Sequence, residues 1–373
     1  MAIALAEILR QFVPQYRRRY NRALLPSHER AFRDIICCRT PALGGHLWHC
    51  PQCDREVYVY HGCRNRACPA CHADQTQKWL VKRQAELLPC DYFHCTATVP
   101  EGLRELFRSN QKMLCGLLMS LSAQCIQEVA GNPRRLGARP GILAVLHTWT
   151  ATLLYHPHVH CLVTAGGTSP GGTQWVATRP GFFLPVRVLS RHLRTLFRDA
   201  LQRHPELYAQ VPLKVWQQEW VVHCVPWGNG QRGVLEYLAR YVFRVAISER
   251  RLLAMDAATV TFAYKDRKAN QHRTCRLEGV EFVRRFFQHI LPRGFHKVRY
   301  FGLWHPQNKA LAQQVRLMLQ LEMTTATQRA SEPANAIQPA RPFQPACPSC
   351  GCQNLQHVRE LRPQRPAYPI RGP

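Results

Sequence analysis

The spacing of hydrophobic positions along the 373-residue chain predicts a mixture of helices and strands. Apolar residues at intervals of three and four predict helices at 1–36, 75–88, 101–130, 189–204, 233–243 and 279–290. Shorter apolar runs rich in β-branched and aromatic residues predict strands at 92–99, 142–147, 158–164 and 215–225, and a hairpin of 260–265 with 272–276. Helices and strands are interspersed, which indicates an α+β fold.

Changes in composition divide the chain into four segments. Residues 1–36 are expected to form a basic helical arm, and residues 37–84 are rich in cysteine. Residues 85–310 contain most of the predicted strands, so we expect the main domain there. Residues 311–373 are rich in proline and predict a tail that is poorly ordered outside a second cysteine-containing stretch at 347–357.

The charge of the chain adds to this prediction of a folded domain, because it indicates a polyanionic partner. The chain carries 50 Lys plus Arg against 23 Asp plus Glu, a formal net charge of +27. Arginine dominates the basic clusters, as in RRRY, RNRAC, ERRL and VRRFF. Arginine forms bidentate contacts with phosphate, so the expected partner is nucleic acid.

The cysteine content and the N-terminus bear on the compartment. The first residues carry a charge at Glu7 and only a brief apolar stretch, which does not fit a signal peptide, and we expect no membrane-spanning segment. In a chain of this size without an export signal, 17 cysteines indicate metal ligands or reduced thiols. We therefore expect a cytoplasmic protein with no membrane partner.

Two Cys-x-x-Cys knuckles predict a structural zinc site. Cys50 and Cys53 form one knuckle, and Cys68 and Cys71 form the other after fourteen intervening residues. Each knuckle can place two thiolates on one tetrahedral ion, so the four cysteines are expected to hold a single Zn²⁺. Four other residues could substitute or support these ligands, and spacing does not choose among them: His46, His49, Cys63 and His72.

A third knuckle lies near the C-terminus. Cys347 and Cys350 are followed by Cys352 and His357, which together could hold another zinc. The same residues are equally compatible with an incomplete half-site in a loose tail. The sequence leaves both interpretations open.

A histidine motif and a tyrosine motif carry the candidate chemistry. In HPHVH, His158 and His160 would leave one face of a strand side by side and could grip a divalent ion. In YLARYVFR, Tyr237 and Tyr241 would share one helix face, with Arg240 and Arg244 nearby to bind phosphate. Either pair alone occurs readily by chance or in a core, so their combination carries the interpretation.

The chain resembles the two-tyrosine HUH transposases of bacterial rolling-circle insertion sequences, which carry an N-terminal zinc-binding domain. The resemblance covers most of the chain and rests on these blocks in this order: CPQC, CRNRACPAC, YFHCTATVP, LLYHPHVHCLVTAGG, YLARYVFR and RRFFQHILPRGFHKVRYFG. It implies that residues 37–84 are the zinc-binding domain. It also implies that residues 85–310 are an HUH-type palm, a central antiparallel sheet flanked by helices.

The resemblance further implies residue roles and a reaction. His158 and His160 match the ligands of a catalytic Mg²⁺ or Mn²⁺, and Tyr237 and Tyr241 match two nucleophiles that form 5′-phosphotyrosine intermediates. The substrate would be single-stranded or hairpin DNA at element ends, in the bacterial cytoplasm near the nucleoid. A third metal ligand is expected, and His156 is a candidate, although Pro157 could bend the strand and remove it.

Three alternatives remain open at this stage. The same site would serve a rolling-circle replication initiator or a relaxase. The histidine pair could hold a second zinc instead, because imidazole suits zinc well. A zinc-containing DNA-binding protein without activity would use the histidines and tyrosines as core residues.

Overall fold

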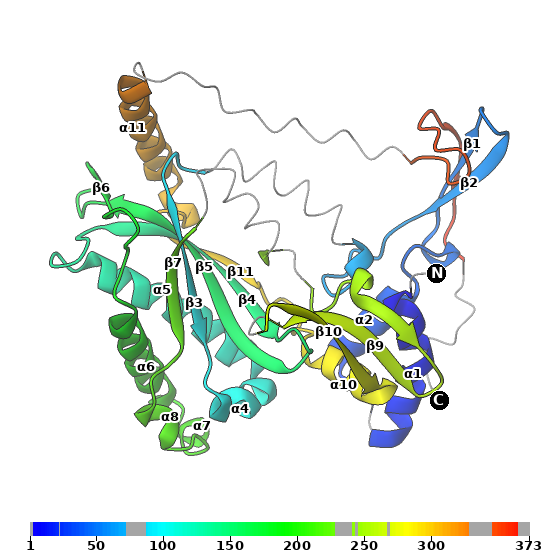
Figure 1. Cartoon of the computed structure of the whole chain (residues 1–373), viewed down its shortest axis with the longest axis horizontal. Helices are drawn as coiled ribbons and strands as arrows, with labels where there is room; N and C mark the ends of the chain where they lie inside the picture. Colours follow the sequence, from blue (N-terminus) through cyan, green and yellow to red (C-terminus); the bar gives the residue numbers. More distant parts are fainter. Residues whose placement is uncertain are drawn as a thin grey trace.

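The computed structural model describes residues 3–21, 23–71, 87–227, 241–242, 245–266, 269–327 and 345–364. Its centre is an antiparallel sheet in the order β11-β4-β5-β3-β7, with a short strand β6 paired to β5. The strands are β3 (Tyr92–Thr98), β4 (Arg139–Trp149), β5 (Tyr155–Thr168), β6 (Trp175–Ala177), β7 (Val222–Trp227) and β11 (Val298–Gly302). The α+β fold with a central antiparallel sheet is confirmed (Figure 1).

The two faces of this sheet differ in what covers them. Alternate residues of β3, β4 and β5, such as Cys95, Ala144 and Val159, join a core with α5 (Gln111–Gly131) and α6 (Val186–Gln202). Residues on one strand alternate between faces, so the intervening residues point away from these helices. That opposite face carries the histidines described below.

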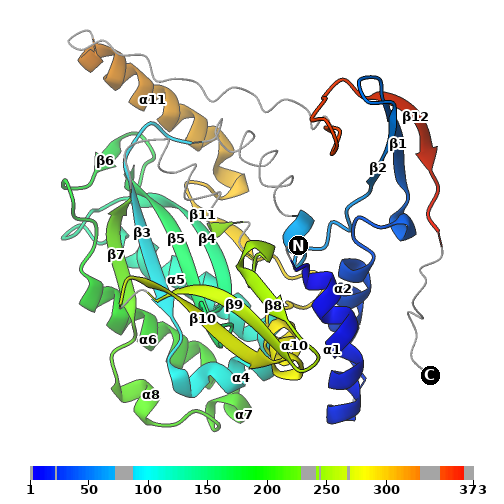
Figure 2. The same ribbon diagram turned by 45° about the vertical axis from the view of Figure 1, so that its right-hand side comes forward.

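A smaller antiparallel sheet forms a second core with the N-terminal helices. Its strands are β8 (Leu252–Met255), β9 (Thr259–Asp266) and β10 (Gln271–Glu278), followed by α10 (Gly279–Gln288). The helix α1 (Leu5–Tyr20) buries Leu5, Ile8 and Phe12 in this core, and α2 (Pro26–Ile36) buries Phe32 and Ile35. Residues of the expected arm thus pack against elements about 250 positions later in the chain (Figure 2).

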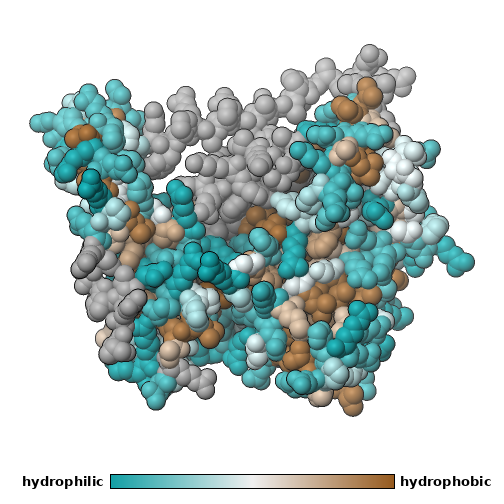
Figure 3. Space-filling model, turned by 180° about the vertical axis from the view of Figure 1, so that it is seen from behind, coloured by the Kyte–Doolittle hydropathy of each residue, from teal (hydrophilic) through white to brown (hydrophobic). Residues whose placement is uncertain are grey.

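A third sheet joins distant parts of the sequence. The hairpin β1 (Gly45–Cys50) and β2 (Arg55–Tyr60) pairs through β1 with β12 (Gln356–Leu361), antiparallel throughout. Figure 2 shows β12, in red, beside the blue hairpin. Figure 3 shows this lobe at the upper left, covered mostly by hydrophilic residues.

The remaining described elements are short connections and one late helix. They are η1 (Pro41–Leu43), η2 (Glu101–Leu103), α4 (Arg104–Ser109), α7 (Pro205–Tyr208), α8 (Lys214–Gln217), η3 (Glu249–Arg251), η4 (Pro306–Asn308) and α11 (Lys309–Thr327). Among the described helices, α5 has the length and apolarity that could cross a membrane, but 67% of its most apolar stretch is buried inside the protein. Its position between β4 and α6 is that of a core helix.

Several predicted elements differ from the structure in their boundaries. The predicted helix at 1–36 is two helices, because Pro26 begins a new one and suits a first helical turn. The predicted helix at 101–130 breaks at Asn110, whose φ of −124° is not helical. The predicted strand at 215–225 begins only at Val222, because 214–217 form a helical turn. The predicted helix at 75–88 lies largely outside the described residues, as does most of the one at 233–243.

A glycine-to-alanine change tests the contact between the N-terminal helices and α10. A Cβ on Gly279 would lie 2.2 Å from two ring carbons of Phe12, which is fully buried. We expect Gly279→Ala to lower the free energy of unfolding by about 1–3 kcal/mol through overpacking. Urea denaturation of the full chain measures this. Gly131→Ala is the matched control, because nothing lies within 4 Å of the added carbon. Equal stability of the two variants would contradict the contact.

Candidate active site and zinc clusters

Strand register brings three histidines together on the sheet face opposite α5 and α6. His147 on β4 lies opposite His158 on β5, and His160 follows two positions later on the same face of β5. One ring nitrogen from each of the three lies within 4.8 Å of the others. His147 and His160 are buried, and His158 is partly buried. The predicted pair is therefore part of a three-histidine cluster.

Hydrogen bonds orient the three imidazoles. Nδ1 of His158 donates to the carbonyl of His156 at 2.7 Å, and Nε2 of His147 donates to the carbonyl of Tyr241 at 2.8 Å. Nδ1 of His160 lies 2.9 Å from Nε2 of His94. Such bonds fix the tautomer and the direction of a metal-binding imidazole. Each ring thus has a nitrogen that is oriented by a protein group, as the imidazoles of metal sites do.

The candidate third ligand differs from the one expected. His156 is not a member of the cluster, and its backbone carbonyl, not its ring, holds His158. Its place is taken by His147, which the antiparallel register carries from the neighbouring strand. In the sequence, His147 could be noticed only as a histidine at the end of the predicted strand 142–147. Only the pairing of that strand with HPHVH could have shown that they meet.

Tyr241 lies against the histidine cluster. Its ring centroid is 4.5 Å from that of His160, 5.4 Å from that of His94 and 5.9 Å from that of His147. The residue is only 8% exposed. Tyr237, Arg240 and Arg244 lie outside the described residues, so their predicted roles remain predictions.

The donor set can be compared with the ions expected. Three imidazole nitrogens in a compact, partly buried group fit a divalent ion of borderline softness, such as Mn²⁺ or Zn²⁺, better than Mg²⁺, which favours oxygen ligands. An ion there would need oxygen atoms of substrate or water to complete its coordination. The site therefore has the composition of an open metal centre.

Eight of the 17 cysteines form two separate groups of four. The first contains Cys38, Cys63, Cys68 and Cys71, with sulfur atoms 3.4–3.7 Å apart in the pairs Cys38–Cys71, Cys38–Cys68 and Cys63–Cys71. A tetrahedral Zn²⁺ with Zn–S bonds of about 2.3 Å sets its sulfurs about 3.8 Å apart. The first cluster has that spacing.

The second cluster joins the N-terminal hairpin to the C-terminal tail. Sγ of Cys50 lies 3.5 Å from that of Cys350, and Sγ of Cys53 lies 3.5 Å from that of Cys347. Backbone N–H groups of Ser349 and Cys350 lower the pKa of Cys347 to about 6, which favours the thiolate that binds metal. The third knuckle is therefore half of a four-cysteine group.

The expected site made of Cys50, Cys53, Cys68 and Cys71 needs correction, because the two knuckles belong to different clusters. The reason is the length of the hairpin between them. Cys50 ends the six-residue strand β1, about 17 Å from its beginning at roughly 3.3 Å per residue. Cys63 comes just after the returning strand β2 ends at Tyr60. The two knuckles are thus held at opposite ends of one hairpin.

Comparisons with known proteins define the class of protein that carries these sites. A family model described as a putative transposase matches residues 141–312, which contain all three clustered histidines. A model described as a transposase zinc-binding domain matches residues 8–99, which contain the whole first cysteine cluster. The class is that of a transposase with an N-terminal zinc-binding domain. Cys347 and Cys350 lie outside both matched regions.

Relatives place the chain within one family. The chain is 40% identical over 315 residues to the putative transposase y4qJ of Sinorhizobium fredii, covering 80% of this chain and 79% of the relative. It is 30% identical over 287 residues to the transposase for insertion sequence element IS801 of Pseudomonas savastanoi pv. phaseolicola, covering 72% and 68%. The chain belongs to the two-tyrosine transposase family of bacterial insertion sequences. No solved structure matches it.

The number of zinc ions per chain distinguishes two four-cysteine sites from a single site. We expect two Zn²⁺ per purified chain, because two complete four-cysteine groups are present. Cys347→Ser with Cys350→Ser should reduce the zinc content to one per chain, and so should Cys68→Ser with Cys71→Ser. Elemental analysis of the folded variants measures the change. Cys352→Ser is the control, since Cys352 belongs to neither group of four. One zinc in the wild type, kept by the Cys347 and Cys350 variant, would restore the single-site interpretation.

Proposed function

We propose that this transposase cuts and rejoins one DNA strand at the ends of its element through a covalent tyrosine intermediate. Tyr241 and Tyr237 are the proposed nucleophiles, and the cluster of His147, His158 and His160 is the proposed catalytic metal site. The observation that carries the proposal is the 4.5 Å separation between the rings of Tyr241 and His160. A nucleophile that lies this close to a metal ligand can attack a phosphate bound to the same metal.

The reaction proposed for the tyrosine conserves the energy of the broken bond. The phenol oxygen would attack the scissile phosphorus, forming a bond to the 5′-phosphate as the bond to the 3′-oxygen breaks. The phenol proton is lost and the departing 3′-oxygen takes up a proton, so charge and atoms balance. A different 3′-hydroxyl attacking the phosphotyrosine would rejoin strands and release the phenol. No nucleotide cofactor is needed, because one phosphodiester replaces another.

The protein must make a weak nucleophile effective. A phenol has an ordinary pKa near 10, so little phenolate is present at neutral pH. A divalent ion, when bound, would polarise the phosphate and stabilise charge on the leaving oxygen. The three imidazoles would hold it, and His94 and Thr96, 2.9 and 3.3 Å from Nδ1 of His160, would fix the direction of that ring.

Composition and family support a DNA substrate. The formal charge of +27 would neutralise backbone phosphates, and a transposase acts on DNA. Single-stranded or hairpin ends and a rolling-circle course are proposed from the resemblance. Two tyrosines would allow a second cleavage before the first is resolved. Arg240 and Arg244 are the proposed phosphate contacts beside them.

One observation favours a non-catalytic role for Tyr241. At 8% exposure, it packs with Tyr92, Val145 and Leu162 in a small apolar cluster, as a structural residue would. In that case the chain would bind DNA without forming an adduct. The experiment below separates the two roles.

Covalent adduct formation tests the proposed chemistry. Single-stranded DNA carrying element ends is incubated with the full chain and Mn²⁺, and adducts are resolved on a denaturing gel. We expect adducts with wild type, and none with Tyr237→Phe plus Tyr241→Phe or with His158→Ala plus His160→Ala. His204→Ala, at an exposed position just before α7, should behave as wild type. Adducts that persist in the double tyrosine variant would contradict the proposal.

The identity of the third ligand has its own test. His147→Ala should lower the rate of adduct formation at least tenfold and raise the Mn²⁺ concentration for half-maximal rate, because a ligand is lost. His156→Ala is the matched control. Its ring is outside the cluster, and the backbone carbonyl that orients His158 is kept. If the His156 variant, and not the His147 variant, lost metal dependence, the assignment of His147 would fail.

A further inference from the structure

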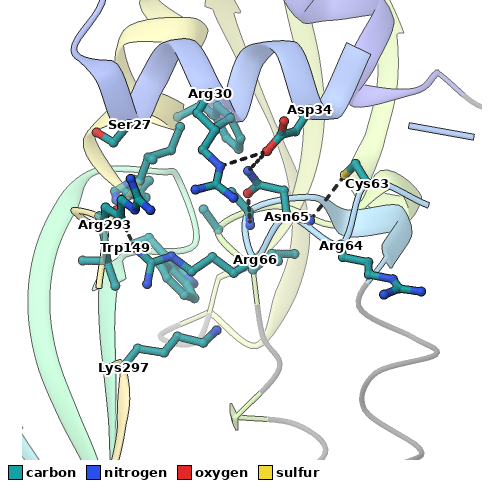
Figure 4. A pocket seen from close by; sticks show the side chains of 18 of the residues that line it. Ser27, Arg30, Asp34, Cys63, Arg64, Asn65, Arg66, Trp149, Arg293 and Lys297 are labelled. Atoms are coloured by element: carbon teal, nitrogen blue, oxygen red, sulfur yellow. Dashed lines mark hydrogen bonds and ion pairs between the residues drawn. The ribbon is translucent and has the colours of Figure 1, made fainter. Parts of the chain in front are cut away.

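A basic cavity of about 360 Å³ lies between the first cysteine cluster and the central sheet. Among the described residues that line it, five are cationic and one is acidic: Arg30, Arg64, Arg66, Arg293, Lys297 and Asp34. Figure 4 shows Arg30 on α2 at one side and Lys297 at the opposite side, with Arg66 between them. The volume is within the range of small-ligand sites, about 300–1,000 Å³.

The positive charge is built into the cavity. The guanidinium of Arg66 donates to the carbonyls of Phe295 at 2.6 Å and Pro292 at 2.7 Å, which fix its position. Burial and, to a smaller extent, the charge of Arg66 lower the pKa of Lys297 to about 8. An anion bound in the cavity would offset both the cost of burying the charge of Lys297 and its repulsion by Arg66. The single acid in the lining, Asp34, pairs with Arg30 at 3.6 Å and accepts a hydrogen bond from Asn65 at 2.9 Å, so the lining keeps an excess of positive charge.

The cavity lies next to the histidine cluster and the first cysteine cluster. Trp149 lines it and stacks on His147 of the histidine cluster, with ring centroids 4.6 Å apart and planes at 21°. Cys63 of the first cysteine cluster also lines it, and Arg64 and Arg66 lie in the segment between Cys63 and Cys68. Metal bound by these thiolates would therefore hold both ends of a segment that carries two of the arginines.

We propose that this cavity binds the backbone phosphate of the DNA strand next to the nucleotide held at the histidine cluster. The proposal rests on the proposed function, because it assigns the cavity to the same strand. Arginine and lysine around a concave site bind phosphate without reading sequence. The cavity would thus fix the path of the strand between the zinc-binding domain and the sheet. Zinc would act on cleavage indirectly, by positioning the arginine-bearing segment.

Charge removal at the rim tests the cavity. Arg30 and Arg293 are exposed, so Arg30→Gln with Arg293→Gln should fold normally. Binding of a labelled single-stranded oligonucleotide by the full chain is measured by anisotropy across a range of salt. A plot of log K against log salt has a negative slope, and this slope should become shallower by about 1.4, at roughly 0.7 per lost phosphate contact. Arg191→Gln with Arg203→Gln removes the same charge from exposed positions on or beside α6 and should leave the slope unchanged.

A second variant tests the interior of the cavity. Lys297→Met keeps the length of the side chain and removes its charge, and its fold is checked by thermal denaturation. It should weaken oligonucleotide binding relative to the wild type and to the Arg191 and Arg203 control. Oligonucleotide binding equal to that of the Arg191 and Arg203 control, in both the rim and interior variants, would overturn the proposal.

The outcomes also separate this proposal from the one on catalysis. If the wild type forms adducts and the cavity variants bind the oligonucleotide as well as the wild type does, the cavity proposal is wrong and the tyrosine chemistry is supported. If the slope of log K against log salt is shallower in the cavity variants and no protein forms an adduct, the cavity is supported as a DNA site and the tyrosine chemistry is rejected.

Discussion

The pairing of His147 on β4 with His158 on β5 determines where the other groups of the candidate active site lie. Successive residues of a strand alternate between faces, so a slip of one residue in this register would send His158 and His160 to the face packed by α5 and α6. That face is filled by apolar residues such as Val159 and Cys161, and burying imidazoles there would cost several kcal/mol without partners. The hydrophobic pattern of β5 therefore holds the histidines on the face opposite α5 and α6.

The second cysteine cluster solves a different problem, that of stabilising a small sheet with little core. The β1–β2–β12 sheet buries a small group that includes Cys50, Val57 and Cys347. A core of that size does not stabilise an isolated sheet, and a structural zinc supplies folding free energy directly. Because the second cluster takes cysteines from both ends of the chain, it would also close the chain on itself. The first cluster lies in the larger core formed by α1, α2 and α10.

Much of this arrangement could be predicted from local sequence, and the remainder depends on long-range pairing. Periodicity and Pro or Gly endings located the strands that became β3, β4, β5, β9 and β10, and motif order indicated the family. Cys-x-x-Cys spacing identified metal ligands but not their partners, because Cys347 and Cys350 are nearly 300 positions from Cys50 and Cys53. His147 and His94 were missed for the same reason, since their role follows from strand register. The helical turn at 214–217 was taken for strand because Val215 and Trp216 are also common in strands.

The location of a bound metal tests the central claim most directly. Crystals of the full chain grown with Mn²⁺ and a single-stranded oligonucleotide can be measured on both sides of the manganese absorption edge. The account predicts a manganese peak among the imidazoles of His147, His158 and His160, with a DNA phosphate between it and Tyr241. A manganese peak at any other group of residues, or a phosphate bound away from Tyr241, would contradict it.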